Sequence, residues 1–156
     1  MELSATILDK KWRDEFAKML IAFGLIWLLL FCVIGFVIGI QHADYTEKME
    51  EIAAENNLED YWGTWSDWKA QAVSHAHALC FATIAILLGL IIPFINLGES
   101  TINIMGWFLI IGVILASVFE LYKVLPLMVI GHLLIMIALV IAIIGVFKSE
   151  ETSVRL

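Results

Sequence analysis

Long apolar runs, separated by short polar stretches, dominate the pattern of this chain. Four of them come close to the ~20 residues that an α-helix needs to cross the hydrocarbon core of a bilayer. Inside hydrocarbon the backbone must satisfy its own hydrogen bonds, so runs of this length are predicted to be helices. The predicted spans are residues 19–41, 72–95, 102–122 and 125–147.

The connections between the last three runs are short, which predicts that consecutive helices are antiparallel neighbours. The chain is therefore predicted to be all-α, a single membrane domain over residues 1–156 arranged as an up-down-up-down four-helix bundle. Residues 1–18 have apolar positions at helical spacing, which favours an amphipathic segment at the membrane surface that runs into the first span. No small-x-small cleavage site follows Gly39, so the first span is expected to be retained rather than removed as a signal peptide.

Composition supports a membrane protein and disfavours several other classes. The 156 residues are 62% hydrophobic and 16% charged, with a formal net charge of −7, whereas soluble domains carry roughly 25% charged residues. The acidic balance and the lack of a basic patch disfavour nucleic-acid binding. Neither Gly-x-Ser-x-Gly nor His-Glu-x-x-His occurs, so two common hydrolase motifs are missing. The sequence does not decide whether the chain is an enzyme.

Lysine and arginine predict the orientation, because positive residues concentrate in the cytoplasmic segments of membrane proteins. The two tails carry six of them, and the segments on the opposite side carry three. Both termini are therefore predicted to be cytoplasmic. The six are Lys10, Lys11, Arg13, Lys18, Lys148 and Arg155, and the three are Lys48, Lys69 and Lys123.

The polar stretch at residues 42–71 is predicted to be an extracytoplasmic loop that contains a short amphipathic helix. It carries eight acidic residues against two lysines, which makes it a candidate docking surface for an extracytoplasmic partner. Trp62, Trp65 and Trp68 recur every third residue, and tryptophan prefers the headgroup level of a bilayer. We expect an aromatic belt at the membrane surface. The alternative is a cap over a cofactor or ligand near that surface.

Small residues and cysteines add limited detail. Gly35 and Gly39 are four residues apart in the first span, which predicts a close approach by another helix. Cys32 and Cys80 lie within predicted spans and form no Cys-x-x-Cys motif, so no disulfide framework is predicted. Covalent attachment of a c-type haem is excluded because Cys-x-x-Cys-His does not occur.

All four histidines are predicted to lie near the same membrane face. His42 follows the first span at its outer end, and His132 lies about two turns into the fourth. His75 and His77 open the second span. Glu120, the one acid inside a predicted span, lies about one turn below the same face. Ionisable groups inside a membrane are costly, so they are candidate functional groups.

This set predicts a haem or metal site. Imidazole ligates haem iron and transition metals, and bundles hold such groups between side chains of different helices. His77 and His132 lie at matched depths and are the preferred ligands of a b-type haem, whereas His75 points elsewhere and is the weaker candidate. Alanines of the second helix, together with Gly131, are expected to leave room for a macrocycle. For copper, iron or zinc, the candidate ligands are His42, His75, His77, Glu120 and His132.

The segment SHAHALCFATIAILLGLIIP, residues 74–93, resembles a pattern in bacterial membrane proteins related to haem–copper oxidase subunits. In that pattern a His-x-His pair opens a transmembrane helix that continues through a glycine-containing apolar run. His75, His77 and Gly89 carry the resemblance in this chain. It implies haem or copper in preference to zinc, and a location in a prokaryotic cytoplasmic membrane.

The combined prediction is a small membrane protein that binds haem b or a transition metal at its outer face. Its expected role is electron transfer, or haem or copper handling, in a respiratory-type complex. Expected partners are the lipid bilayer, other membrane subunits or further copies of the chain, and quinol or an extracytoplasmic protein. The alternative is a structural or assembly subunit without a cofactor, in which the histidines are ordinary interfacial residues and Glu120 pairs with Lys123. A transporter is less favoured, because the spans show no pair of broken helices.

Overall fold

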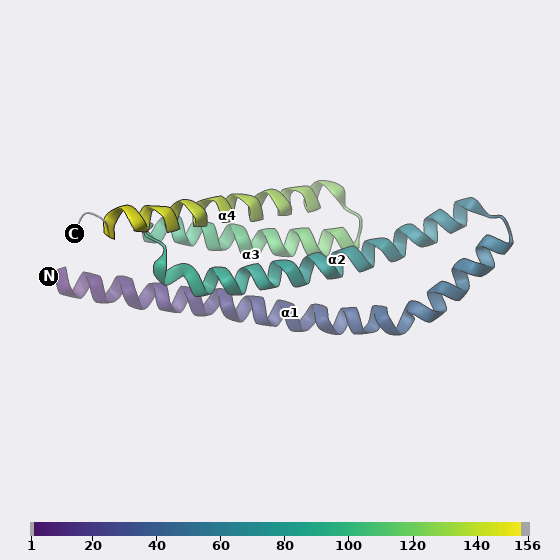
Figure 1. The fold of residues 1–156 in the computed structure, drawn as a ribbon, viewed down its shortest axis with the longest axis horizontal. Helices are drawn as coiled ribbons and strands as arrows, with labels where there is room; N and C mark the ends of the chain where they lie inside the picture. Colours follow the sequence, from purple (N-terminus) through teal and green to yellow (C-terminus); the bar gives the residue numbers. More distant parts are fainter. Residues whose placement is uncertain (1, 154–156) are drawn as a thin grey trace.

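Over residues 2–153, whose backbone the computed structural model describes, the chain forms a bundle of four long helices with its two ends on the same side (Figure 1). Side chains are described for residues 11–148, so Lys10 and Arg155 of the predicted orientation lie outside them. The predicted all-α, up-down arrangement is confirmed. The elements are α1 (Glu2–Ala54), α2 (Leu58–Ile91), the short 3₁₀ helix η1 (Ile92–Phe94), α3 (Glu99–Leu121) and α4 (Leu125–Ser153).

The first two helices are longer than the spans predicted for them. α1 has 53 residues, which is about 80 Å at 1.5 Å per residue, whereas the hydrocarbon core is about 30 Å thick. Both α1 and α2 continue well past the turn between α3 and α4 and meet beyond it (Figure 1). The predicted loop at residues 42–71 is therefore a helical hairpin, because this stretch has no proline, only one glycine, and apolar side chains at helical spacing. We name residues 42–71 the polar hairpin.

Two asparagines make the tip of the polar hairpin. Asn56 has a φ of 55°, in the left-handed region that asparagine tolerates better than most residues. Asn57 then caps α2, since its side-chain oxygen accepts a hydrogen bond from the Asp60 N–H at 3.3 Å. The chain reverses within a few residues, and the two helices run back antiparallel.

Small residues bring neighbouring helices into close contact. A Cβ added to Gly24 of α1 would lie 2.7 Å from the carbonyl oxygen of Ala82 on α2. A Cβ added to Gly112 of α3 would lie 2.8 Å from the carbonyl oxygen of Gly131 on α4. Such packing is typical of membrane bundles, where lipid is as apolar as the side chains and close backbone approach replaces the hydrophobic force. Helices that follow one another along the chain are therefore neighbours in space.

Only one of the two glycines predicted to allow a close approach in the first span contacts another helix. Gly35 lies against the ring of His75, but an added Cβ at Gly39 would have no described neighbour within 4 Å. The prediction is therefore wrong for Gly39. The reason is that α1 passes α2 at Gly35 and presents the Gly39 position to open space.

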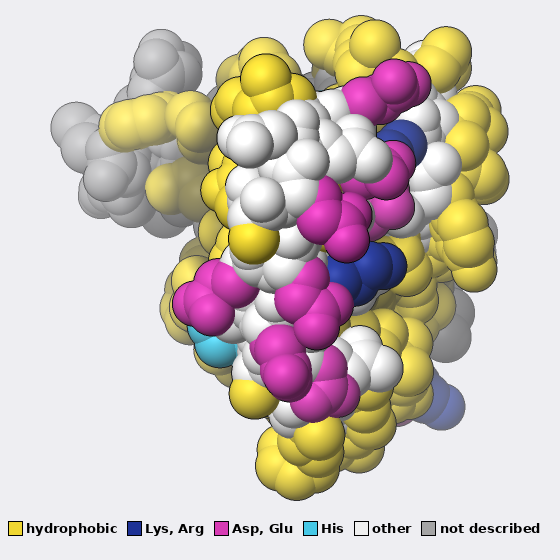
Figure 2. All heavy atoms as spheres, turned by 90° about the vertical axis from the view of Figure 1, so that its right-hand side faces the viewer, with side chains coloured by type: hydrophobic (Ala, Val, Ile, Leu, Met, Phe, Trp, Pro, Cys, Tyr) yellow, Lys and Arg dark blue, Asp and Glu magenta, His cyan; other side chains and the backbone are white. Residues whose placement is uncertain are grey.

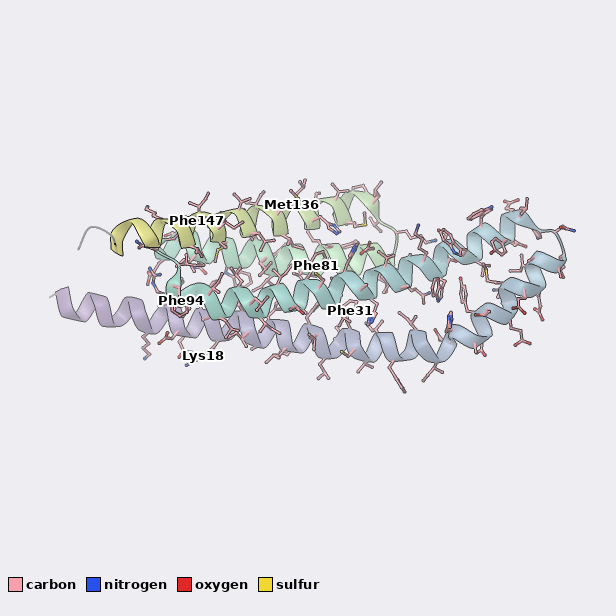
Figure 3. The ribbon with its side chains drawn as sticks, viewed as in Figure 1. Lys18, Phe31, Phe81, Phe94, Met136 and Phe147 are labelled. Carbon is pink, nitrogen blue, oxygen red and sulfur yellow. The ribbon has the colours of Figure 1, made fainter. Side chains whose placement is uncertain are left out.

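Apolar side chains cover the outside of the bundle as well as its core. Phe31 and Phe81 are buried within it, whereas Met136 and Phe147 of α4 point outward with exposed fractions of 60% and 63% (Figure 3). Each of the four helices is long and apolar enough to cross a membrane. Large exposed apolar surfaces mark contact with lipid or with other membrane proteins. The chain is therefore a multi-pass integral membrane protein.

The first residues of α1 are part of the bundle. From Glu2 onward, α1 runs without a break through the segment 1–18 that was predicted to lie on the membrane surface. The guanidinium of Arg13 donates hydrogen bonds of 2.8 Å to the carbonyl oxygens of Ile95 and Leu97, between α2 and α3. The segment is thus tied to the end of the bundle that holds the termini.

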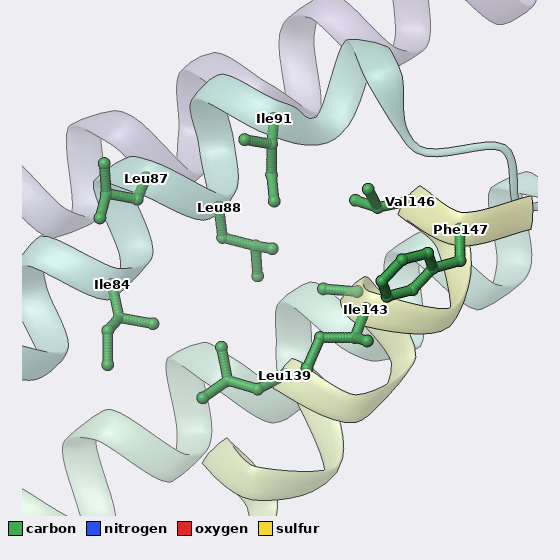
Figure 4. A pocket seen from close by; sticks show the side chains of 9 residues that line it. Ile84, Leu87, Leu88, Ile91, Leu139, Ile143, Val146 and Phe147 are labelled. Carbon is green, nitrogen blue, oxygen red and sulfur yellow. The ribbon is translucent and has the colours of Figure 1, made fainter. Parts of the chain in front are cut away.

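A cavity of about 290 Å³ lies between α2 and α4 in the half of the bundle nearer that terminal end (Figure 4). Its lining is entirely apolar and includes Leu88, Ile91, Leu139 and Ile143. Such a cavity offers no polar group that could orient a substrate or bind a metal. Candidate chemistry therefore lies at the opposite end, where α2, α3 and α4 carry ionisable side chains.

Candidate functional site

Three of the predicted site residues meet at the hairpin end of the bundle, each on a different helix. Nδ1 of His77 on α2 lies 2.8 Å from Oε2 of Glu120 on α3. The rings of His77 and His132, which belongs to α4, contact each other edge to face, with centroids 5.6 Å apart and planes at 79°. The structure thus brings His77, Glu120 and His132 together. With Phe81, these residues are named the histidine cluster.

In both imidazoles of the cluster, Nδ1 is the ring nitrogen that forms a hydrogen bond. Nδ1 of His132 lies 2.8 Å from the carbonyl oxygen of Met128, one turn earlier in α4. Since a carbonyl oxygen can only accept, this Nδ1 carries the hydrogen, and Nε2 of the neutral ring keeps its lone pair. An ionised Glu120 fixes His77 in the same tautomer. Metal-binding histidines almost always donate one ring N–H to a carboxylate or carbonyl and bind the metal through the other nitrogen.

Phe81 completes the cluster and was missed from the sequence. Its ring centroid lies 5.8 Å from that of His77 and 5.4 Å from that of His132, and the side chain is buried. It therefore packs against both imidazoles and restricts their rings. The available signal was its spacing, because a residue four positions after His77 lies on the same helix face.

The carboxyl group of Glu120 is deeply placed, while His77 remains accessible. Their side chains are 11% and 43% exposed. The predicted alternative partner of Glu120, Lys123, instead donates to Ser66 at 3.0 Å and forms an ion pair with Asp67. A buried carboxylate is unfavourable without a partner, and His77 supplies it. The predicted Glu120–Lys123 pair is therefore wrong.

Two serines and a tryptophan fasten three helices beside the cluster. The hydroxyl of Ser74, fully buried on α2, donates 2.6 Å to the carbonyl oxygen of Ser117 on α3. Nε1 of Trp27 on α1 donates to the Ser117 hydroxyl at 3.4 Å. Ser74 and Ser117 each lie three residues before a cluster residue, so these bonds help to fix the separation of α2 and α3 at the site.

The other two histidines lie elsewhere. The ring of His75 faces α1, where a Cβ added to Gly35 would lie 2.5 Å from its Nε2. His42 packs on Trp68 of the polar hairpin, with ring centroids 5.7 Å apart. The helix repeat explains the separation of His75 from His77, since residues two apart point about 200° away from each other. The five predicted metal ligands are therefore not gathered at one point.

The cluster supplies two imidazoles and not a complete set of protein ligands for a metal ion. Among side chains of residues 11–148, no group of three or more His, Cys, Asp or Glu is placed to hold a metal ion. At three of the positions predicted to leave room for a macrocycle there is no free space, because Ala82 and Ala85 are fully buried and Gly131 lies against the backbone of Gly112 and Ala116. Haem b stays a prediction.

No protein-family model matches the chain, and neither a curated protein nor a solved structure matches it.

A cavity of about 490 Å³ leads toward the cluster from the base of the polar hairpin. Glu120 and Met128 line it beside the apolar Val73, and Lys69 and Lys123 lie on its polar side. Both Glu120 and Met128 hold an imidazole of the cluster through a hydrogen bond. Neither His77 nor His132 lines the cavity, so it reaches the groups that orient the imidazoles and not the rings themselves.

Proposed function

We propose that this chain is a membrane subunit that binds a transition-metal ion through Nε2 of His77 and of His132. Copper is the preferred metal. Its role is electron transfer or copper handling in a respiratory-type complex. One observation carries the proposal: the two imidazoles touch each other while each Nδ1 is held by an acceptor. Glu120 acts as the hydrogen-bond partner that orients His77, and such partners tune the affinity of metal-binding histidines.

The geometry favours a single ion over haem b. The two ring centroids are 5.6 Å apart in direct contact, so a macrocycle between them would have to displace packed side chains. Copper forms the tightest complexes with nitrogen ligands among the divalent first-row metals, and copper(I) is stable with only two ligands. The resemblance of residues 74–93 to proteins related to haem–copper oxidase subunits also favours copper over zinc.

The lysine and arginine distribution supports an outward-facing site. With both termini in the cytoplasm, the polar hairpin and the histidine cluster lie at the outer face, where the neighbouring cavity opens. An ion or an electron would then be exchanged with an extracytoplasmic protein, or with quinol in the outer leaflet.

The test compares purified wild-type protein with four single variants after growth with added copper and haem. Elemental analysis and an absorption spectrum are recorded for each. About one copper per chain is expected in the wild type, with loss in His77→Ala and His132→Ala. His42→Ala and His75→Ala are the matched controls and should keep the copper.

Two kinds of result would contradict copper binding by His77 and His132. A Soret band that disappears in the His77 and His132 variants would replace copper by haem b. A colourless, metal-free wild type, or equal loss of copper in all four variants, would overturn the proposal.

A second candidate function is a structural or assembly subunit without a cofactor. The polar hairpin favours it, because eight exposed acidic side chains gather on this projecting end of the molecule (Figure 2). Such a surface suits a cationic extracytoplasmic protein. Co-purification with a larger complex that survives replacement of all four histidines by alanine would support this candidate.

A further inference from the structure

A small cavity lies within the polar hairpin, separate from the histidine cluster. It measures about 180 Å³, below the roughly 300–1,000 Å³ of pockets for drug-sized ligands. Four of its six lining side chains carry aromatic rings. The lining consists of His42, Tyr45, Thr46 and Met49 from α1 with Trp65 and Trp68 from α2.

Hydrogen bonds and ring contacts hold this lining in place. The Trp68 ring packs between His42, at 5.7 Å between centroids, and Tyr45, at 6.2 Å. The Tyr45 hydroxyl accepts a 3.1 Å hydrogen bond from the backbone N–H of Trp68 and donates to the carbonyl oxygen of Thr64. Burial raises the pKa of Tyr45 above its ordinary value of 10.0, so the phenol keeps the proton that it donates. The aromatic walls are therefore preorganised.

The charge around the cavity favours a cation. The polar hairpin carries eight acids and two lysines, a formal charge of −6. Nζ of Lys69 already lies 4.7 Å from the centroid of the Trp65 ring, which is a cation–π distance. Lys69 covers Trp65, one wall of the cavity, without lining the cavity itself.

We propose that this aromatic cavity binds a quaternary ammonium group, such as the trimethylammonium head of a choline-type molecule. A quaternary ammonium has no N–H and loses no hydrogen bond among aromatic walls, where the ring faces attract its charge. Two sources present the same chemistry. One is the headgroup of phosphatidylcholine in the adjacent membrane surface, and the other is a soluble choline or betaine.

The first experiment uses the full chain in nanodiscs of phosphatidylglycerol, which contain no choline. Calorimetric titrations with tetramethylammonium and choline are compared with 3,3-dimethylbutan-1-ol, the neutral isostere of choline. Both cations should bind saturably, and choline at least fivefold more tightly than the isostere, because only the cation gains from the ring faces. Equal binding of choline and the isostere, or no saturable binding of either cation, would overturn the proposal.

A pair of variants then locates the site. Trp65→Leu removes one wall and should weaken choline binding at least fivefold. Tyr61→Leu removes an aromatic side chain of the same hairpin that does not line the cavity, and it should leave the affinity unchanged. Circular dichroism confirms that each variant keeps its helices. Equal weakening in both variants would contradict the assignment.

A final comparison separates the two sources of the ligand. The choline titration is repeated in nanodiscs of phosphatidylcholine. If the lipid headgroup occupies the cavity, competition lowers the apparent affinity for choline. An unchanged affinity assigns the cavity to a soluble quaternary ammonium compound.

Discussion

Each contact of His77 restricts its ring in a different way. Glu120 fixes the protonated nitrogen, His132 meets the ring edge to face, and Phe81 packs beside it. Matched depth along two helices was enough to predict that His77 and His132 meet. The helix repeat also separated His75 from His77, but depth could not place His42, because depth does not give the direction in which a helix face turns.

Replacing Glu120 by leucine should weaken copper binding by about 10–100-fold, the usual effect of removing a hydrogen-bond partner from a metal-binding histidine. The leucine fills similar space but cannot accept the N–H of His77. Competition with a chromogenic copper chelator measures the affinity. The control is Glu99→Leu, an exposed position at the other end of α3. If the two variants bind copper equally well, Glu120 does not orient a ligand.

The polar hairpin shows what hydropathy can and cannot predict about a helix. Hydropathy located all four spans, because apolar length is set by the bilayer. It ended the first span at residue 41, although α1 continues to Ala54. Beyond the membrane the helix depends on pairing between α1 and α2, as between Tyr45 and Trp68, and such pairing is invisible to a hydropathy window.

Hydrogen–deuterium exchange tests whether the polar hairpin is helical. Backbone amides of residues 46–57 and 61–66 should exchange more slowly than unstructured peptide, because they donate hydrogen bonds to backbone carbonyls. Amides of Leu58 and Glu59 should exchange faster than those on either side, because N–H groups in the first turn of a helix have no backbone acceptor within it. Exchange of the whole stretch at unprotected rates would show that the loop predicted from the sequence is correct after all.

Packing of α3 against α4 depends on Gly131. A Cβ there would lie against the backbone nitrogen of Ala116 and 2.8 Å from the carbonyl oxygen of Gly112. Backbone atoms cannot move aside cheaply, so Gly131→Ala should lower the free energy of unfolding by about 1–3 kcal/mol. Thermal unfolding in detergent, followed by circular dichroism, measures the change. Gly39→Ala adds the same methyl group where no neighbour lies within 4 Å, and the idea fails if it destabilises as much.

For the whole molecule, the apolar exterior and the charged ends define how it lies in a membrane. The termini share one end, and the polar hairpin projects from the other (Figure 1). An even number of predicted spans was sufficient to place both termini at one end, and the short connections among the last three spans predicted that these helices alternate. Which end faces the cytoplasm depends on the lysine and arginine distribution alone.

Cysteine labelling in intact cells tests that orientation. The starting protein has Cys32 and Cys80, both exposed and unpaired, replaced by alanine. A membrane-impermeant maleimide should label Asn57→Cys at the hairpin tip from outside. Glu99→Cys, at the start of α3, should react only after the membrane is opened. The reverse pattern would place the histidine cluster at the cytoplasmic face.

Electron spin-echo modulation of the copper(II)-loaded protein tests the central claim most directly, because it detects the remote nitrogen of each coordinated imidazole. The account predicts modulation from two imidazoles in the wild type, in His42→Ala and in His75→Ala. His77→Ala and His132→Ala should each show modulation from one imidazole at most. A spectrum without imidazole modulation, or one that changes in His75→Ala but not in His77→Ala, would contradict the assignment of His77 and His132 as the metal ligands.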